Sequence, residues 1–261
     1  SHGVSGILND ETKYHDTKVS NLSKTVQAKL EEEYPTLTFR YRKSISKKEI
    51  NDRLHSIDGD LGQSLFVDKA VIKPDGGLLE VKDDKGIWRI ILVSEAKYQG
   101  KDIENIKAGK LVGKKKNQDI MTAGNAIERA HKNISEIANY MLAEMYFPYV
   151  LFLEGSNFLT ENITVIRPDG REVTLTYKSG ALNRLDRLTA SNYGMPINKN
   201  LCENKTVALN GNSIMLQATS IFTKGNGDRW GRTEMIEIML DIARTSLKML
   251  GKDLFVQITG K

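Results

Sequence analysis

The sequence has few cysteines and prolines and no long apolar run. Its single cysteine, Cys202, cannot form an internal disulfide, which excludes the disulfide framework of small secreted proteins. We expect Cys202 to be a small buried side chain. No segment approaches the roughly 18 consecutive apolar residues of a membrane-spanning helix. The first ten residues lack the basic and then apolar pattern of a signal peptide, so we expect a cytoplasmic protein.

Several catalytic patterns are missing as well. The glycine- and lysine-rich stretch 109–116 has Ala108 where a phosphate-binding loop needs its first glycine, and Lys115 where it needs Ser or Thr. The four histidines lack the paired spacing of metal ligands. There is no GxSxG elbow for an acyl-transfer nucleophile. A DNA methyltransferase would need a glycine-rich cofactor loop and an Asn/Asp-Pro-Pro-aromatic motif, and neither is present.

Positive charge is concentrated in two stretches. Residues 97–116 contain seven lysines and two acidic residues, a local charge of +5, and residues 40–53 carry six basic residues and two acidic ones, a local charge of +4. The whole chain nets only +5, so the remainder is slightly acidic. Basic clusters on a near-neutral body indicate a surface that follows phosphates. A solvated charged face is the alternative.

Apolar periodicity predicts an α/β fold. We expect helices over 19–33, 47–54, 125–145 and about 233–250. We expect hairpins from strands 78–82 and 87–97 and from strands 163–167 and 172–177, and further strands at 149–153 and 213–218. The run Ile90–Val93 is apolar on both faces, which is typical of a central strand. The order strand, long helix, strand favours a crossover and a partly parallel sheet. The simplest organisation is a single domain over 1–261, with a mixed central sheet flanked by helices.

The pattern that carries chemistry is Pro74-Asp75, nineteen intervening residues, and Glu95-Ala96-Lys97. Alternate strand residues share a face, so Glu95 and Lys97 should project together, ~6.5–7 Å apart. The hairpin can fold Asp75 back beside Glu95. Two carboxylates, with the Ala96 carbonyl as a further ligand, can hold a hard divalent cation, and an ammonium can offset charge on phosphorus. Asp169, in a second Pro-Asp pair, has no Glu-X-Lys within thirty residues after it and should only form a turn.

Together with other segments, this pattern resembles a known family. The segments are 72–77 (IKPDGG), 95–97 (EAK), 123–129 (AGNAIER), 152–157 (FLEGSN), 182–188 (LNRLDRL) and 192–197 (NYGMPI). From about Gly3 to the C-terminus the chain resembles the EcoRI family of type II restriction endonucleases, within the PD-(D/E)XK nucleases. Thr122 stands where the family pattern has alanine.

The resemblance implies a bacterial, Mg²⁺-dependent homodimer, with Mn²⁺ as a substitute, that cuts double-stranded DNA at GAATTC after G. It implies DNA-wrapping arms, with an arm hairpin at about 162–178, a catalytic hairpin over 72–97 and a recognition segment and helix over 118–145. Asp75, Glu95 and Lys97 match the catalytic residues. The residues expected to contact DNA are Lys114, Met121, Ala123, Gly124, Asn125, Ala126, Glu128, Arg129, Arg184 and Arg187.

The residue types agree with this assignment. The Asn125 amide can bond adenine bidentately, and Arg129 can donate to a purine. Glycine and alanine permit a close approach of the backbone to base edges. Two alternatives remain open: a DNA-binding protein that no longer cuts, and a repair or junction nuclease on the same core fold. A plasmid nicking assay with Mg²⁺ would test the first, and a discrete digestion ladder would exclude the second.

Overall fold

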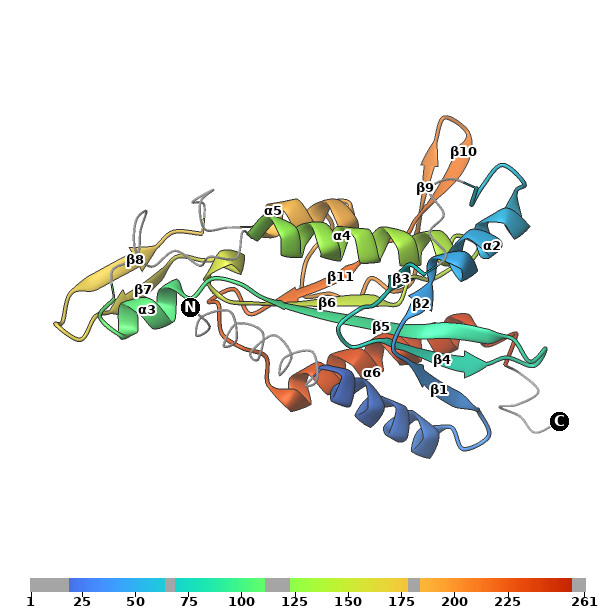
Figure 1. Cartoon of the computed structure of the whole chain (residues 1–261), viewed down its shortest axis with the longest axis horizontal. Coiled ribbons are helices and arrows are strands. Elements are labelled where there is room, and N and C mark those ends of the chain that lie inside the picture. The colour runs from blue at the N-terminus through green and yellow to red at the C-terminus, as the bar shows by residue number, and fades with distance from the viewer. Residues whose placement is uncertain (1–18, 64–68, 111–122, 178–183, 255–261) are drawn as a thin grey trace.

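The structure is a computed structural model that describes residues 19–63, 69–110, 123–177 and 184–254. A five-stranded mixed sheet, in the order β1-β4-β5-β6-β11, forms its centre (Figure 1). Its strands are β1 Phe39–Arg42, β4 Leu78–Lys82, β5 Trp88–Tyr98, β6 Tyr149–Glu154 and β11 Ser220–Thr223. Strands β1, β4 and β5 pair antiparallel, whereas β5, β6 and β11 pair parallel. The predicted mixed sheet is therefore confirmed, with the run Ile90–Val93 in its middle strand.

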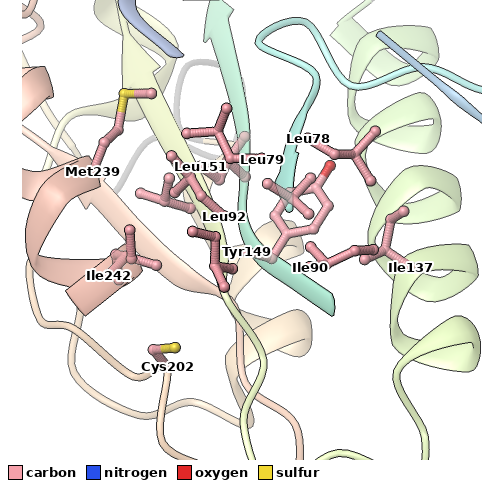
Figure 2. Close-up of a cluster of buried hydrophobic side chains, with 14 of the residues drawn as sticks. Leu78, Leu79, Ile90, Leu92, Ile137, Tyr149, Leu151, Cys202, Met239 and Ile242 are labelled. Carbon is pink, nitrogen blue, oxygen red and sulfur yellow. The ribbon is translucent and has the colours of Figure 1, made fainter. Parts of the chain in front are cut away.

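Helices cover both faces of this sheet. Helix α4 (Ala123–Tyr140) and helix α5 (Leu185–Leu188) lie on one face, and the helix over 19–33 and helix α6 (Arg232–Met249) lie on the other (Figure 1). In the core, Ile137 of α4 and Ile242 of α6 approach the sheet from opposite sides (Figure 2). Both are fully buried, and each such side chain stabilises the fold by roughly 1.5–3 kcal/mol. Among the described residues, no helix combines the length and apolar character needed to cross a membrane.

A smaller unit projects from one end of the sheet (Figure 1). It contains α3 (Asp102–Lys107) and the hairpin of β7 (Ile163–Ile166) and β8 (Glu172–Leu175). Ile106, Leu159, Val165 and Leu175 form a separate apolar cluster there. The predicted turn at Asp169 is confirmed, because its carboxylate accepts the Arg171 backbone N–H at 3.1 Å. This unit contains the hairpin that the sequence predicts as an arm.

The C-terminal third differs from the prediction. A strand does form at β10 (Asn212–Leu216), but it pairs with β9 (Lys205–Leu209) in a hairpin that is largely exposed. The buried strand is β11, whose four residues are too few, and too polar at their ends, to stand out as an apolar run. Helix α4 ends at Tyr140 rather than near 145, because a turn follows over 141–143.

The remaining elements are short. Helix α2 is longer than predicted and begins at a capping box, in which Ser46 and Glu49 each accept the other's backbone N–H. Its bounds and those of the other short elements are α2 Lys47–Ile57, β2 Ile45–Ser46, β3 Val71–Ile72, η1 Ser156–Phe158 and η2 Thr189–Asn192.

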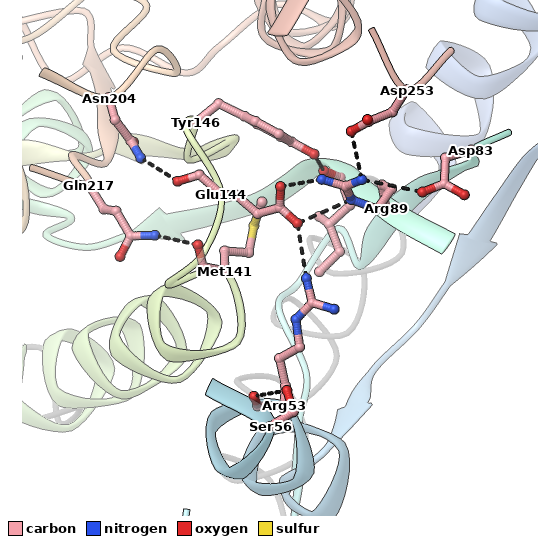
Figure 3. A network of polar contacts seen from close by, with 11 residues as sticks. Arg53, Ser56, Asp83, Arg89, Met141, Glu144, Tyr146, Asn204, Gln217 and Asp253 are labelled. Carbon is pink, nitrogen blue, oxygen red and sulfur yellow. Dashed lines mark hydrogen bonds and ion pairs between the residues drawn. The ribbon is translucent and has the colours of Figure 1, made fainter. Parts of the chain in front are cut away.

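A polar network joins distant segments beside the core (Figure 3). The Glu144 carboxylate accepts two hydrogen bonds from Arg89, at 3.1 and 2.5 Å, and one from Arg53 at 3.1 Å. Arg89 also donates to Asp83 at 3.3 Å and to Asp253 at 3.0 Å. Glu144 and Arg89 are largely buried, with 10% and 16% of their side chains exposed. Glu144 therefore ties β5 and α2 to the segment that follows α4.

Removing this carboxylate should destabilise the fold. Glu144→Ala leaves Arg89 and Arg53 without their shared partner in a poorly solvated place, and we expect a loss of about 3–5 kcal/mol. Urea unfolding measures this loss. Glu203→Ala, at an exposed carboxylate whose backbone pairs with that of Tyr146, should change stability by less than about 0.5 kcal/mol. Equal effects of the two substitutions would refute a structural role for the network.

Candidate active site

The end of β5 extends beyond its partner β4. Pairing with β4 stops at Val93, whereas pairing with β6 continues through Glu95 and Lys97. The turn that carries Asp75 lies against the free edge, since Gly76 N–H donates to the Ser94 carbonyl at 2.9 Å. This approach needs glycine, because a Cβ on Gly76 would lie 1.9 Å from Ser94 Oγ. The turn therefore brings Asp75 to the end of the middle strand.

Asp75, Glu95 and Lys97 meet at this place. Lys97 Nζ lies 2.8 Å from Asp75 Oδ2 and 2.6 Å from Glu95 Oε1. The Glu95 side chain is fully buried, whereas Asp75 and Lys97 are each 16% exposed. Ala96 belongs to the apolar core. The structure thus brings the three residues together as the hairpin geometry predicts, and their catalytic roles stay predictions.

Two further groups hold the Glu95 carboxylate. The Tyr149 hydroxyl at the start of β6 donates to Oε2. Asn133 Nδ2 of α4 lies 3.3 Å from Oε1 and 3.4 Å from Oε2. Neither residue is predicted from the sequence. A signal for Tyr149 existed, because a tyrosine that opens a buried apolar strand needs a partner for its hydroxyl.

Burial dominates the electrostatics of this cluster. Burial raises the pKa of Glu95 above its usual value, Lys97 opposes this rise, and the charge of Asp75 adds to it. Burial alone lowers the pKa of Lys97, but the carboxylates of Glu95 and Asp75 outweigh it, so the pKa is raised. Burial and the neighbouring Glu95 also raise the pKa of Tyr149. Lys97 therefore remains an ammonium, and Tyr149 remains a hydroxyl donor, at neutral pH.

The donor set fits a hard cation. Asp75 and Glu95 converge on one positive charge from two separate segments, so both could contact one metal ion. Among the described residues, no group of three or more His, Cys, Asp and Glu residues is placed to hold a metal ion. Two carboxylates without histidine or thiolate suit Mg²⁺, which keeps several of its waters, better than Zn²⁺.

The residues predicted to contact DNA are only partly described. Glu128 and Arg129 are exposed near the start of α4, and Arg187 is exposed on α5. Arg184 precedes α5, and its backbone N–H donates to the Asn157 carbonyl at 2.7 Å. Lys114 and Met121 lie outside the described residues. Helix α4 begins at Ala123, two residues before the predicted start at 125, so Ala123, Gly124, Asn125 and Ala126 form its first turn, and their contact with DNA stays a prediction.

The basic stretch 40–53 does not form a free positive surface. Arg40 and Arg42 donate to Glu80, which is fully buried. Lys47, Lys48 and Arg53 pair with carboxylates as well, and the partners of the three are Glu136, Asp52 and Glu144. Most of these cations therefore have acidic partners, which leaves little unpaired positive charge in this stretch, and its role as a phosphate-following surface stays a prediction.

The contact between Lys97 and the two carboxylates predicts a stability effect. Lys97→Met leaves Glu95 and Asp75 without their cation and should cost about 3–5 kcal/mol in urea unfolding. The double substitution Glu95→Gln with Lys97→Met also removes the buried charge of Glu95, so its loss should be smaller than the sum of the single losses. Strictly additive losses would show that the contact between Lys97 and Glu95 contributes nothing to the free energy of unfolding.

Comparisons with known proteins show the family of this chain. The family model for restriction endonuclease EcoRI matches residues 1–257. The chain is 64% identical to type II restriction enzyme EcoRI of Escherichia coli over 261 residues, which cover 100% of this chain and 94% of the relative. It is 50% identical to type II restriction enzyme RsrI of Cereibacter sphaeroides over 252 residues, 97% of this chain and 90% of the relative. The chain belongs to the EcoRI family of restriction endonucleases.

Proposed function

We propose that this protein hydrolyses both strands of duplex DNA at the palindrome GAATTC, cutting after G and leaving four-base 5′ overhangs. The observation that carries the proposal is the meeting of Asp75, Glu95 and Lys97 at the end of β5. The relatives named as type II restriction enzymes support the same activity. In a bacterium, such an activity restricts foreign DNA in the cytoplasm.

The three residues would divide the chemistry. Asp75 and Glu95 would hold Mg²⁺, or Mn²⁺ as a substitute, with the Ala96 carbonyl as a further ligand. The bound ion supplies charge stabilisation at the phosphate and favours deprotonation of water. Lys97, whose ammonium lies within hydrogen-bonding distance of both carboxylates, would stabilise the negative charge that develops on the phosphoryl oxygens. The contact of all three groups disfavours a DNA-binding protein that no longer cuts.

Sequence readout is assigned to the start of α4 and to the segment at α5. Glu128 and Arg129 are exposed and free to reach base edges, as is Arg187. Asn125 would read adenine, and Arg184 would act beside Arg187. The hairpin of β7 and β8, with the lysines near Lys114, would form an arm along the DNA. A C₂ homodimer would match the two-fold axis of the palindrome.

The cleavage proposal predicts the outcome of a plasmid digestion. With Mg²⁺, the wild-type protein should give discrete fragments whose sequenced ends lie after G in GAATTC. Asp75→Ala and Lys97→Ala should give no cleavage, because the first removes an anionic ligand and the second removes the cation. Asp169→Ala, at the other Pro-Asp pair, should cut normally. Near wild-type cleavage by either site variant would refute the assignment.

The dimer proposal predicts how a mixed dimer behaves. One subunit has one Asp75, Glu95 and Lys97 and faces one strand. A dimer of one wild-type and one Lys97→Ala subunit should therefore produce nicked circles from a plasmid with one site. Gel separation of nicked and linear forms measures this. Linear product from a single binding event would mean that one site cuts both strands.

A further inference from the structure

Among the described residues, three groups donate to the Glu95 carboxylate, and they come from different parts of the fold. Lys97 and Tyr149 belong to the neighbouring strands β5 and β6 of the central sheet. Asn133 alone belongs to a helix, α4. The carboxylate is therefore held by the sheet through two donors and by α4 through one.

Helix α4 also carries residues to which DNA reading is assigned. Arg129 and Asn133 are four residues apart and so lie on the same side of the helix. Asn125 precedes Asn133 by eight residues, about 12 Å along the axis. One helix thus spans the distance from the proposed reading residues to the carboxylate of Glu95.

Contacts along α4 favour its movement as one body. Ile127, Ala130, Ile134 and Ile137 are all buried in the main apolar core. The ring of His131 lies 2.7 Å from the carbonyl oxygen of Arg187, which connects α4 to α5. Asn133 and the residues before it thus belong to one continuous helix that is anchored along its length.

The contact of Asn133 is long compared with those made by the sheet. Its Nδ2 lies 3.3 and 3.4 Å from the two carboxylate oxygens, whereas Lys97 Nζ lies 2.6 Å from Oε1. Charge-assisted N–H···O bonds are commonly shorter, and an approach of α4 by about 0.5 Å would bring this contact into the usual range. A small shift of the helix would thus change how firmly Glu95 is oriented.

We propose that Asn133 is a positioning residue that couples DNA reading by α4 to the orientation of the Glu95 carboxylate. The inference rests on the proposed function, and it assigns to the recognition helix a direct contact with the catalytic site. A correct site would draw α4 into the position where Asn133 bonds Glu95 well, and a site with an altered base pair would leave the contact long.

Single-turnover cleavage with excess enzyme and Mg²⁺ tests this coupling. The substrates are one duplex containing GAATTC and one with a single altered base pair, and the readout is the ratio of the two rates. Asn133→Ala should slow cleavage of GAATTC by about 10–100-fold, as loss of partners of metal ligands does elsewhere. It should slow the altered duplex much less, so the ratio falls. Affinity for the GAATTC duplex in Ca²⁺ should be unchanged.

Three further variants separate coupling from simple support. Tyr149→Phe removes a donor that belongs to the sheet, so it should slow both duplexes by the same factor and leave the ratio at the wild-type value. Asn139→Ala, at an exposed asparagine of the same helix, should change neither rate. Asn133→Leu branches at the same carbon but has neither donor nor charge, and it should lower the ratio like Asn133→Ala even if the alanine variant folds poorly.

A wild-type ratio in Asn133→Leu and in folded Asn133→Ala would overturn the coupling, whether or not the individual rates fall. An equal fall of the ratio in Tyr149→Phe would also overturn it, because the effect would not depend on the helix. A wild-type protein that cuts neither duplex, or both equally, would refute the proposed function itself.

Discussion

A fully buried carboxylate at the end of the middle strand is the constraint on which the site depends. Taking a carboxylate out of water costs several kcal/mol unless charge and hydrogen bonds compensate it. Lys97, Tyr149 and Asn133 supply this compensation for Glu95 from β5, β6 and α4. Asp75 then comes from the turn before β4 and contacts the same ammonium. The order of strands and the crossover helix are thus linked to the chemistry of a single side chain.

The same rule governs charge elsewhere in the fold. Glu80 is fully buried and is compensated by Arg40 and Arg42, and Glu144 is compensated by Arg89 and Arg53. Cations that suggest a phosphate-binding stretch in the sequence therefore compensate carboxylates of the protein itself. Local net charge is a poor guide to a DNA surface when arginines alternate along a strand beside buried carboxylates, as they do in β1.

Features with a strong local pattern could be predicted from the sequence. The hairpin of β4 and β5, strand β6 and helices α4 and α6 follow from long apolar patterns bounded by turns. Asp75, Glu95 and Lys97 follow from strand alternation and hairpin folding, which are also local. Strand β11 could not be predicted, because its four residues are buried by neighbours distant in sequence.

The residues that hydrogen-bond to the Glu95 carboxylate also come from distant parts of the sequence. Asn133 lies 38 residues from Glu95 in sequence, and Tyr149 lies 54 residues from it. Nothing in the residues around Asn133 marks it as a partner of a carboxylate, because the contact arises only when α4 crosses over the sheet. The spacing of a motif thus predicts the candidate catalytic residues. The residues that hydrogen-bond to them can be identified only from the tertiary structure.

The proposed chemistry requires that Asp75 and Glu95 form one cation site at the end of β5. The most direct measurement is the thermal unfolding midpoint in EDTA and in excess Mg²⁺, because an ion that binds only the folded state raises this midpoint. We expect Mg²⁺ to raise it for the wild-type protein and for Asp169→Asn, but not for Asp75→Asn or Glu95→Gln. An equal rise in all four proteins, or no rise in the wild-type protein, would contradict the claim.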